Sequence, residues 1–463
     1  MLPATPSLSM PRILVPLLLA LAGALLALRV GPLEQAAVQE QLDSFPDVQA
    51  KAHLLRPVIA VILCFLPAIG GMLYYIGDTL ARYVSRQFVS IFLICMFGLF
   101  AVWLIADLGD NLDDLKNSKD AAGYAAQLYL ARLPEVIVTL LPYSLLLSIL
   151  YCLGRLSRSR EIVAMIQTGR GLTRLTLPYF VGGALAAVLC AGLNYQWAPA
   201  AVGAENAILR KANGQDSVAE PNIRYRNFDD RRLWMIGSFP QDYHKGVPLR
   251  RVTVIQENPD GTVARILSAK TAAWSPMTRN WTFTDPRIAD FTPGNSPDGE
   301  SPDFTNAPPP NPLVTKGWTE VPAQLIRPGL PAAQLGIPDL NDWLSANPLG
   351  TWASRGGHLT QWHYRWAQPI NCLIVVLLAV PLGVVFTRRG ASGGVAVAVF
   401  LCAGMLFLSN VCLALGDSGH IRPELAAWLP NAVFGVIALF LFQRRLAGRP
   451  IYQTIRKFIP AEA

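Results

Sequence analysis

The chain has 463 residues, of which 52% are hydrophobic and 15% are charged, and its mean hydropathy is +0.34. Soluble domains carry about 25% charged residues, so this composition argues against an ordinary soluble protein and indicates a membrane protein with one sizeable soluble part. The net charge of +8 does not indicate nucleic-acid binding, because the long polar stretch 201–361 holds 16 basic and 16 acidic residues and is neutral.

Eight apolar segments approach or exceed the length of about 20 residues that a spanning helix needs. They are residues 13–28, 57–77, 87–106, 133–154, 175–200, 366–387, 390–416 and 425–443. Segment 13–28 has only 16 residues between Arg12 and Arg29, which also suits the apolar core of a signal sequence. No small-residue cleavage site follows Arg29, so we favour a span and keep a cleaved signal as the alternative.

The loops between these segments alternate in charge. Four of them together hold 14 Lys and Arg residues against three acidic residues: 78–86, 155–174, 388–389 and 444–463. The intervening loops 31–56 and 107–132 are richer in acidic residues. Because Lys and Arg concentrate in cytoplasmic loops, this alternation predicts eight spans with both termini in the cytoplasm and with the insert 201–361 on the outer side.

Residues 159–169, after the fourth apolar segment, have the pattern of a short amphipathic helix. Ser159 is a candidate N-cap, Glu161 lies in the first turn, and Gly169 suits the position that ends a helix. One face carries apolar residues at helical spacing: Ile162, Met165 and Ile166. Five arginines flank or enter the stretch: Arg155, Arg158, Arg160, Arg170 and Arg174. Such a helix lies at the cytoplasmic surface, anchored to anionic lipid, although the single acid among the arginines suggests a protein partner.

The insert 201–361 has the pattern of β structure. Its predicted strands are residues 250–257, 262–267, 272–274 and 281–283. Turn residues at 258–261 and 275–276 separate them, which is typical of a sandwich or jelly-roll. Residues 292–312 are rich in Pro, Gly, Ser and Asn and predict a long surface loop. Helical periodicity returns only at residues 335–347.

Motifs for nucleotide binding and catalysis are absent from the sequence. There is no GxxxxGK[ST] or GxGxxG phosphate loop, no GxSxG elbow and no HExxH zinc motif. The seven cysteines lie inside predicted spans, and the five histidines have no metal-ligand spacing. We therefore expect no catalytic residue, cofactor or metal, and any ATP that drives the protein must be bound by another chain.

Several segments, taken in chain order, resemble the LptF/LptG permeases of the lipopolysaccharide-export ABC transporter. Each motif is weak alone, but their order and shared topology make the resemblance over residues 78–445 specific. The motifs are Asp78–Val84, Leu133-Pro134, Leu141-Pro142, Gly154–Ser157, Glu161–Met165 with Gly169, the strand region 266–283 with Ala269, Ala272, Trp274 and Trp281, and Val380–Gly383.

The resemblance implies an α-helical multi-span protein of the inner membrane with a periplasmic all-β jelly-roll domain. Six spans belong to the family pattern, and two extra spans precede it. The implied domains are an N-terminal extension 1–77, a first transmembrane half 78–200, a periplasmic domain 201–361, a second transmembrane half 362–445 and a cytoplasmic tail 446–463.

The resemblance also implies a permease subunit that extracts lipopolysaccharide or a related glycolipid and passes it to periplasmic jelly-roll bridge proteins. A cytoplasmic ABC ATPase dimer would bind the ATP, and a second LptF/LptG-type permease would complete the pair. Spans 87–106 and 390–416 would line a lateral gate to the bilayer. The stretch 159–169 would be the coupling helix, with these ATPase-binding candidates: Arg158, Arg160, Glu161, Ile162, Met165, Ile166 and Gly169.

The sequence departs from the family at the outer end of span 87–106, which is acidic where family members often carry basic residues. Lys116 and Lys119 remain the candidate contacts for a lipid headgroup. The sequence leaves open whether the chain is F-like or G-like and whether it pairs with itself. Two other functions stay as alternatives: a non-transporting scaffold whose β domain binds a protein partner, and a lipid-modifying enzyme. The enzyme would need polar residues inside the spans, where Glu135 is an exception.

Overall fold

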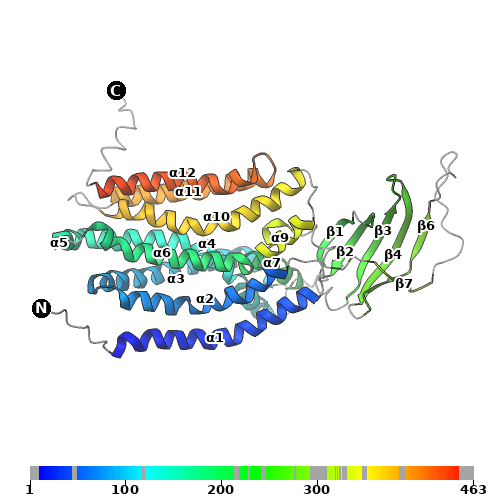
Figure 1. The fold of residues 1–463 in the computed structure, drawn as a ribbon, viewed down its shortest axis with the longest axis horizontal. Helices are drawn as coiled ribbons and strands as arrows, with labels where there is room; N and C mark the ends of the chain where they lie inside the picture. Colours follow the sequence, from blue (N-terminus) through cyan, green and yellow to red (C-terminus); the bar gives the residue numbers. More distant parts are fainter. Residues whose placement is uncertain are drawn as a thin grey trace, which may run out of the picture.

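In the computed structural model the chain forms a layer of long helices with a β-sheet at one end (Figure 1). The residues that the structure describes are 10–43, 50–116, 120–212, 218–227, 230–240, 247–275, 278–291, 310–346, 352–384 and 392–447, without 168, 170, 319, 321, 323–324 and 326–330. Most of the predicted surface loop 292–312 lies outside these ranges.

Eight helices among the described residues are long and apolar enough to cross a membrane. They are α1 (Met10–Asp43), α2 (Ala50–Ile76), α3 (Thr79–Lys116), α4 (Ala121–Arg158), α6 (Leu172–Tyr195), α10 (Trp352–Gly383), α11 (Ser392–Asp417) and α12 (Pro423–Leu446). Each overlaps one of the eight predicted apolar segments. Segments 57–77, 175–200 and 366–387 run past the ends of α2, α6 and α10, and segment 390–416 begins before α11. The apolar stretch of α1 covers Leu14–Gln39, so it is long enough for a span rather than limited to residues 13–28.

Helices α4 and α10 form the centre of the helical layer. In each of them 72% of the apolar stretch is buried by the rest of the protein, against 6% in α2 and α3 and 11% in α1. Helix α10 packs against α4, α6, α11 and α12, whereas α1 packs mainly against α2. The peripheral helices therefore keep most of their apolar surface for the bilayer or for another protein.

Two predicted outer loops proved to be mostly helical. Residues 31–56 contain the end of α1 and the start of α2, and residues 107–132 contain the end of α3 and the start of α4. Hydropathy marks only the part of a helix that lipid surrounds, because backbone hydrogen bonding continues into water without apolar side chains. The predicted apolar segments therefore lie in long helices, but the prediction was wrong about where these helices begin and end.

Short helices connect the spans to one another and to the sheet. Helix α5 (Glu161–Gln167) joins α4 to α6, and α7 (Trp197–Ala212) follows α6. After the sheet, the 3-10 helix η3 (Ala332–Gln334) and α9 (Ile337–Ala346) lead into α10, and α9 matches the helical periodicity predicted at 335–347. Because α7 and the start of α10 are helical, strands occupy only residues 218–315 of the range 201–361.

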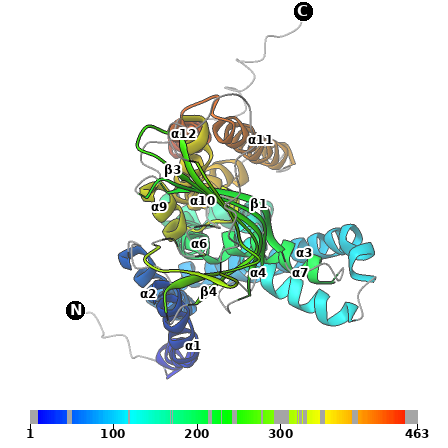
Figure 2. The same cartoon turned by 90° about the vertical axis from the view of Figure 1, so that its right-hand side faces the viewer.

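Seven strands form one antiparallel sheet. They are β1 (Val218–Asn227), β2 (Arg232–Pro240), β3 (Leu249–Glu257), β4 (Val263–Ser275), β5 (Asn280–Thr284), β6 (Arg287–Asp290) and β7 (Leu313–Thr315). The order is β1-β2-β3-β4-β5-β7, with β6 also paired to β4. The predicted strands match β3, β4 and β5, and β4 joins two of them. Strands β1, β2, β6 and β7 were not predicted. The sheet curls in Figure 2, and the jelly-roll itself stays a prediction.

Aromatic side chains fill the core of the sheet. Trp234, Trp281 and Phe283 are fully buried and contact one another across β2 and β5. Arg232 and Glu320 form a buried ion pair at 2.8 Å, and the Arg232 guanidinium lies over the ring of Trp318. Among the described residues this core is packed with aromatic side chains, and the buried carboxylate of Glu320 is paired with an arginine.

Candidate functional site

Helix α5 lies at the end of the helical layer opposite the sheet (Figure 1). Its apolar face is turned into the spans: Ile162 is 1% exposed, and Met165 and Ile166 pack against the same apolar core. Its outer face exposes Val163 and Ala164. The amphipathic pattern in the sequence is therefore satisfied by packing on the protein's own spans, and the opposite face is open.

The two ends of α5 differ in how well the sequence anticipated them. Gly169 has φ +83°, the left-handed conformation that glycine adopts at little cost after a helix. Ser159 caps the end of α4 rather than the start of α5, which corrects the predicted N-cap. Between the helices Arg160 has φ +57°, a value that is uncommon outside glycine, so a tight turn joins α4 to α5.

The carboxylate of Glu161 accepts hydrogen bonds at the surface from two hydroxyl groups of the same chain. The hydroxyl of Tyr83, on α3, donates to Glu161 Oε2 at 2.9 Å, and the hydroxyl of Ser159 donates to Oε1 at 2.8 Å. Tyr83 was missed because it lies 78 residues away in sequence and nothing in its local pattern marks it. The structure thus connects α5 to α3, and a contact of Glu161 with a partner stays a prediction.

Two arginines beside Glu161 remain available at the surface. Arg158 and Arg160 are exposed, and neither forms an ion pair with another residue that the structure describes. Exposed cations next to an exposed apolar residue form a surface that can meet either lipid phosphates or a protein partner.

Apolar side chains also remain exposed along α3 and α11. On α3 these include Phe97 and Ile105, and on α11 they include Phe400 and Phe407. Seen along the long axis, α3 and α11 lie toward the same side of the molecule (Figure 2). These helices correspond to the predicted gate spans 87–106 and 390–416, so the structure leaves both of them accessible from one side.

At the sheet end of the helical layer, Arg132 of α4 is buried among acidic residues. It lies 2.7 Å from Asp107 of α3 and 2.8 Å from Glu205 of α7, and its guanidinium is over the ring of Trp103. Burial raises the pKa of Glu205, and Arg132 opposes that shift. The acidic end of α3 therefore contacts a basic residue of the same chain.

The side chains of the predicted headgroup contacts lie outside the described part of the chain. Lys116 is the last residue of α3, but its side chain is outside the described part of the chain, and so is all of Lys119. Whether either lysine meets a lipid phosphate stays a prediction.

Eight long apolar helices, a surface helix between two of them and an antiparallel sheet at one end define a multi-pass membrane protein with an extramembrane β domain. The chain belongs to the LptF/LptG family, because the family model described as "Lipopolysaccharide export system permease LptF/LptG" matches residues 82–444, more than half of its length. A search of the curated proteins finds no match.

Membership places the chain among the multi-pass permeases of lipopolysaccharide export in the inner membrane, which are transporter subunits and not enzymes themselves. The matched range begins at Arg82, so α1, α2 and the first residues of α3 lie outside it. The two N-terminal helices are therefore an addition to the part of the chain that the family model describes.

Proposed function

We propose that this chain is a permease subunit that extracts lipopolysaccharide, or a related glycolipid, and delivers it to periplasmic bridge proteins of jelly-roll fold. A separate cytoplasmic ATPase dimer binds the ATP and docks on α5. A second LptF/LptG-type permease, or a second copy of this chain, faces α3 and α11. Both termini are cytoplasmic and the sheet is periplasmic. Arginines at the α5 end support this orientation, because basic residues favour the cytoplasmic side.

The coupling role is supported by one observation, namely that α5 contacts the spans at two points. Ile162 is buried in the core shared with α4 and α10, and Glu161 accepts a hydrogen bond from Tyr83 of α3. A partner that moves α5 therefore displaces both the central spans and a peripheral span. Shifting a two-state equilibrium from mostly open to mostly closed takes about 5.5 kcal/mol, for which ATP binding by the partner is a sufficient source.

The lipid path follows from the exposed surfaces. The apolar faces of α3 and α11 suit acyl chains that enter from the bilayer, because neither face requires a polar contact along its middle. When the two permeases close, lipid is displaced toward the sheet. The edge strands β1 and β7 each pair with only one of the described strands, so the edges of the sheet suit strand addition by a bridge protein of similar fold.

The docking role is tested by comparing two variants that both lose the Tyr83–Glu161 hydrogen bond. Glu161→Lys reverses a charge on α5, whereas Tyr83→Phe leaves the surface of α5 unchanged. We expect Glu161→Lys to abolish co-purification of the ATPase and Tyr83→Phe to retain it. Arg287→Glu, a charge reversal on exposed strand β6, is the control for an altered net charge and is expected to change nothing.

Undiminished co-purification of the ATPase with Glu161→Lys would contradict docking at Glu161. The scaffold alternative predicts more: all α5 substitutions would be silent, and no ATPase would co-purify with the wild-type chain. Release of lipopolysaccharide from nanodiscs by the complex, with and without ATP, then decides between transport and anchoring.

A further inference from the structure

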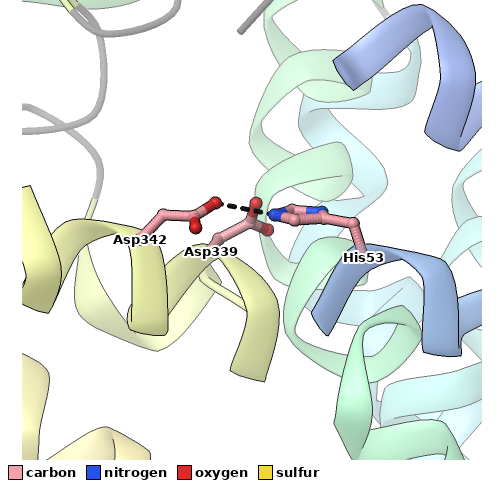
Figure 3. A group of neighbouring side chains, drawn as sticks. All are labelled: His53, Asp339 and Asp342. Carbon is pink, nitrogen blue, oxygen red and sulfur yellow. Dashed lines mark hydrogen bonds and ion pairs between the residues drawn. The ribbon is translucent and has the colours of Figure 1, made fainter. Parts of the chain in front are cut away.

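Three ionisable side chains from distant parts of the chain meet at the sheet end of the helical layer. His53 is on α2, and Asp339 and Asp342 are on α9; Figure 3 shows all three turned toward one another. Each offers one ligand atom, and these atoms all lie within 4.8 Å of one another. His53 Nε2 is 2.6 Å from Asp342 Oδ2. His53 is 0% exposed and Asp342 is buried as well.

The charge of this cluster is not balanced by its own members. Two carboxylates face a single imidazole, so the three side chains carry a net charge of −2 with a neutral imidazole and −1 with an imidazolium. Two neutral amides donate to the carboxylate of Asp339, Gln41 at 3.2 Å and Gln196 at 2.9 Å. Carboxylate oxygens and an imidazole nitrogen that converge in this way are ligand types that divalent metals take in proteins.

Nε2 of His53 faces the carboxylates, and an imidazole binds metal ions through such a nitrogen. Nδ1 of the same ring is buried and has no hydrogen-bond partner among the described residues. The two amide donors fix the orientation of Asp339, as outer hydrogen bonds commonly do for carboxylates that ligate metals.

We propose that His53, Asp339 and Asp342 bind one divalent cation, and that Zn²⁺ suits them best. An imidazole nitrogen with two carboxylate oxygens is a donor set for zinc, whereas Mg²⁺ and Ca²⁺ prefer oxygen alone. The cation replaces the hydrogen bond between His53 and Asp342, and the two side chains separate by the small distance that a shared ion requires.

The site has a structural role, since it connects the N-terminal extension to the family part of the chain. His53 precedes the range that the family model matches, and both aspartates lie inside that range. Helix α9 follows the sheet and packs against α10, one of the two central helices. A bound cation therefore links α2 to α9, the helix between the sheet and the second group of spans.

The test uses the full chain in detergent, freed of metal with a chelator and titrated with Zn²⁺. We expect saturable binding of one ion per chain, weakened at least about 100-fold by His53→Gln or Asp339→Asn and about 10-fold or more by Gln196→Ala, which removes an outer hydrogen bond. His363→Gln, which changes a partly exposed histidine of α10, is the control and is expected to bind as the wild type does.

X-ray absorption of the zinc-loaded wild type provides a measurement that does not depend on how the variants fold. We expect one histidine nitrogen with oxygen ligands. Sulfur ligation, which would place the ion at a cysteine, overturns the proposal. So does the absence of saturable binding to a monodisperse wild-type protein, or binding that His363→Gln removes and His53→Gln leaves intact.

Discussion

At the α5 end of the helical layer Arg158 and Arg160 are exposed, whereas at the sheet end Arg132 is buried between Asp107 and Glu205. The exposed arginines contribute little to stability, because water screens them, and they are free to meet a partner. Buried Arg132 holds three helices together. The charged side chains at the α5 end can therefore change partners, whereas those at the sheet end are held by pairing within the chain.

The largest expected effect comes from breaking the buried cluster. Arg132→Leu leaves the partly buried carboxylates of Asp107 and Glu205 without their cation, and breaking the ion pairs of a buried arginine costs about 3–5 kcal/mol. Thermal unfolding in detergent measures this loss of stability. The matched control is Arg174→Leu, which breaks the exposed pair with Asp78 at 3.7 Å and should cost no more than about 1 kcal/mol. Equal losses would remove the distinction between the two ends.

A smaller effect is expected from the packing of α5. Ile162→Ala removes a side chain that is 1% exposed and should destabilise the protein by about 2–4 kcal/mol, whereas Val163→Ala on the exposed face of the same helix should cost less than about 0.5 kcal/mol. Urea titration of both variants measures the difference. If Ile162→Ala proved as mild as Val163→Ala, α5 would not be packed on the spans as the coupling role requires.

The smallest expected effect is a pH dependence at the sheet end. Burial raises the pKa of Glu205, so the folded state binds its proton more tightly than the unfolded chain does. The stability that this carboxyl contributes is present below its ordinary pKa of about 4.3 and is lost as the pH rises through the raised value. Glu205→Gln cannot titrate, so the stability of the wild type minus that of the variant should fall across this range. A constant difference would contradict the raised pKa.

The sequence predicted well those features that depend on residues close together in the chain. The eight spans depend on runs of apolar residues, α9 on helical spacing, and the end of α5 on the single glycine Gly169. Strands β3 to β5 were found because turn residues bound them. Strand β1 (Val218–Asn227) was missed because proline, arginine and asparagine interrupt its run, so that pairing with β2 rather than local preference makes it a strand. Strands β6 and β7 were missed because four and three residues are too few to show a pattern.

The sequence by itself determined a multi-pass membrane protein with a surface helix near Glu161, because hydropathy and spacing act over a few helical turns. Only the tertiary structure decided that Glu161 accepts a hydrogen bond from Tyr83 and that Arg132 forms ion pairs with Asp107 and Glu205. It also decided that His53 lies beside two aspartates. The absence of metal-ligand spacing along the chain gave no indication of that meeting, since His53 and Asp342 are 289 residues apart. Contacts over such separations depend on how the helices pack, which local patterns do not encode.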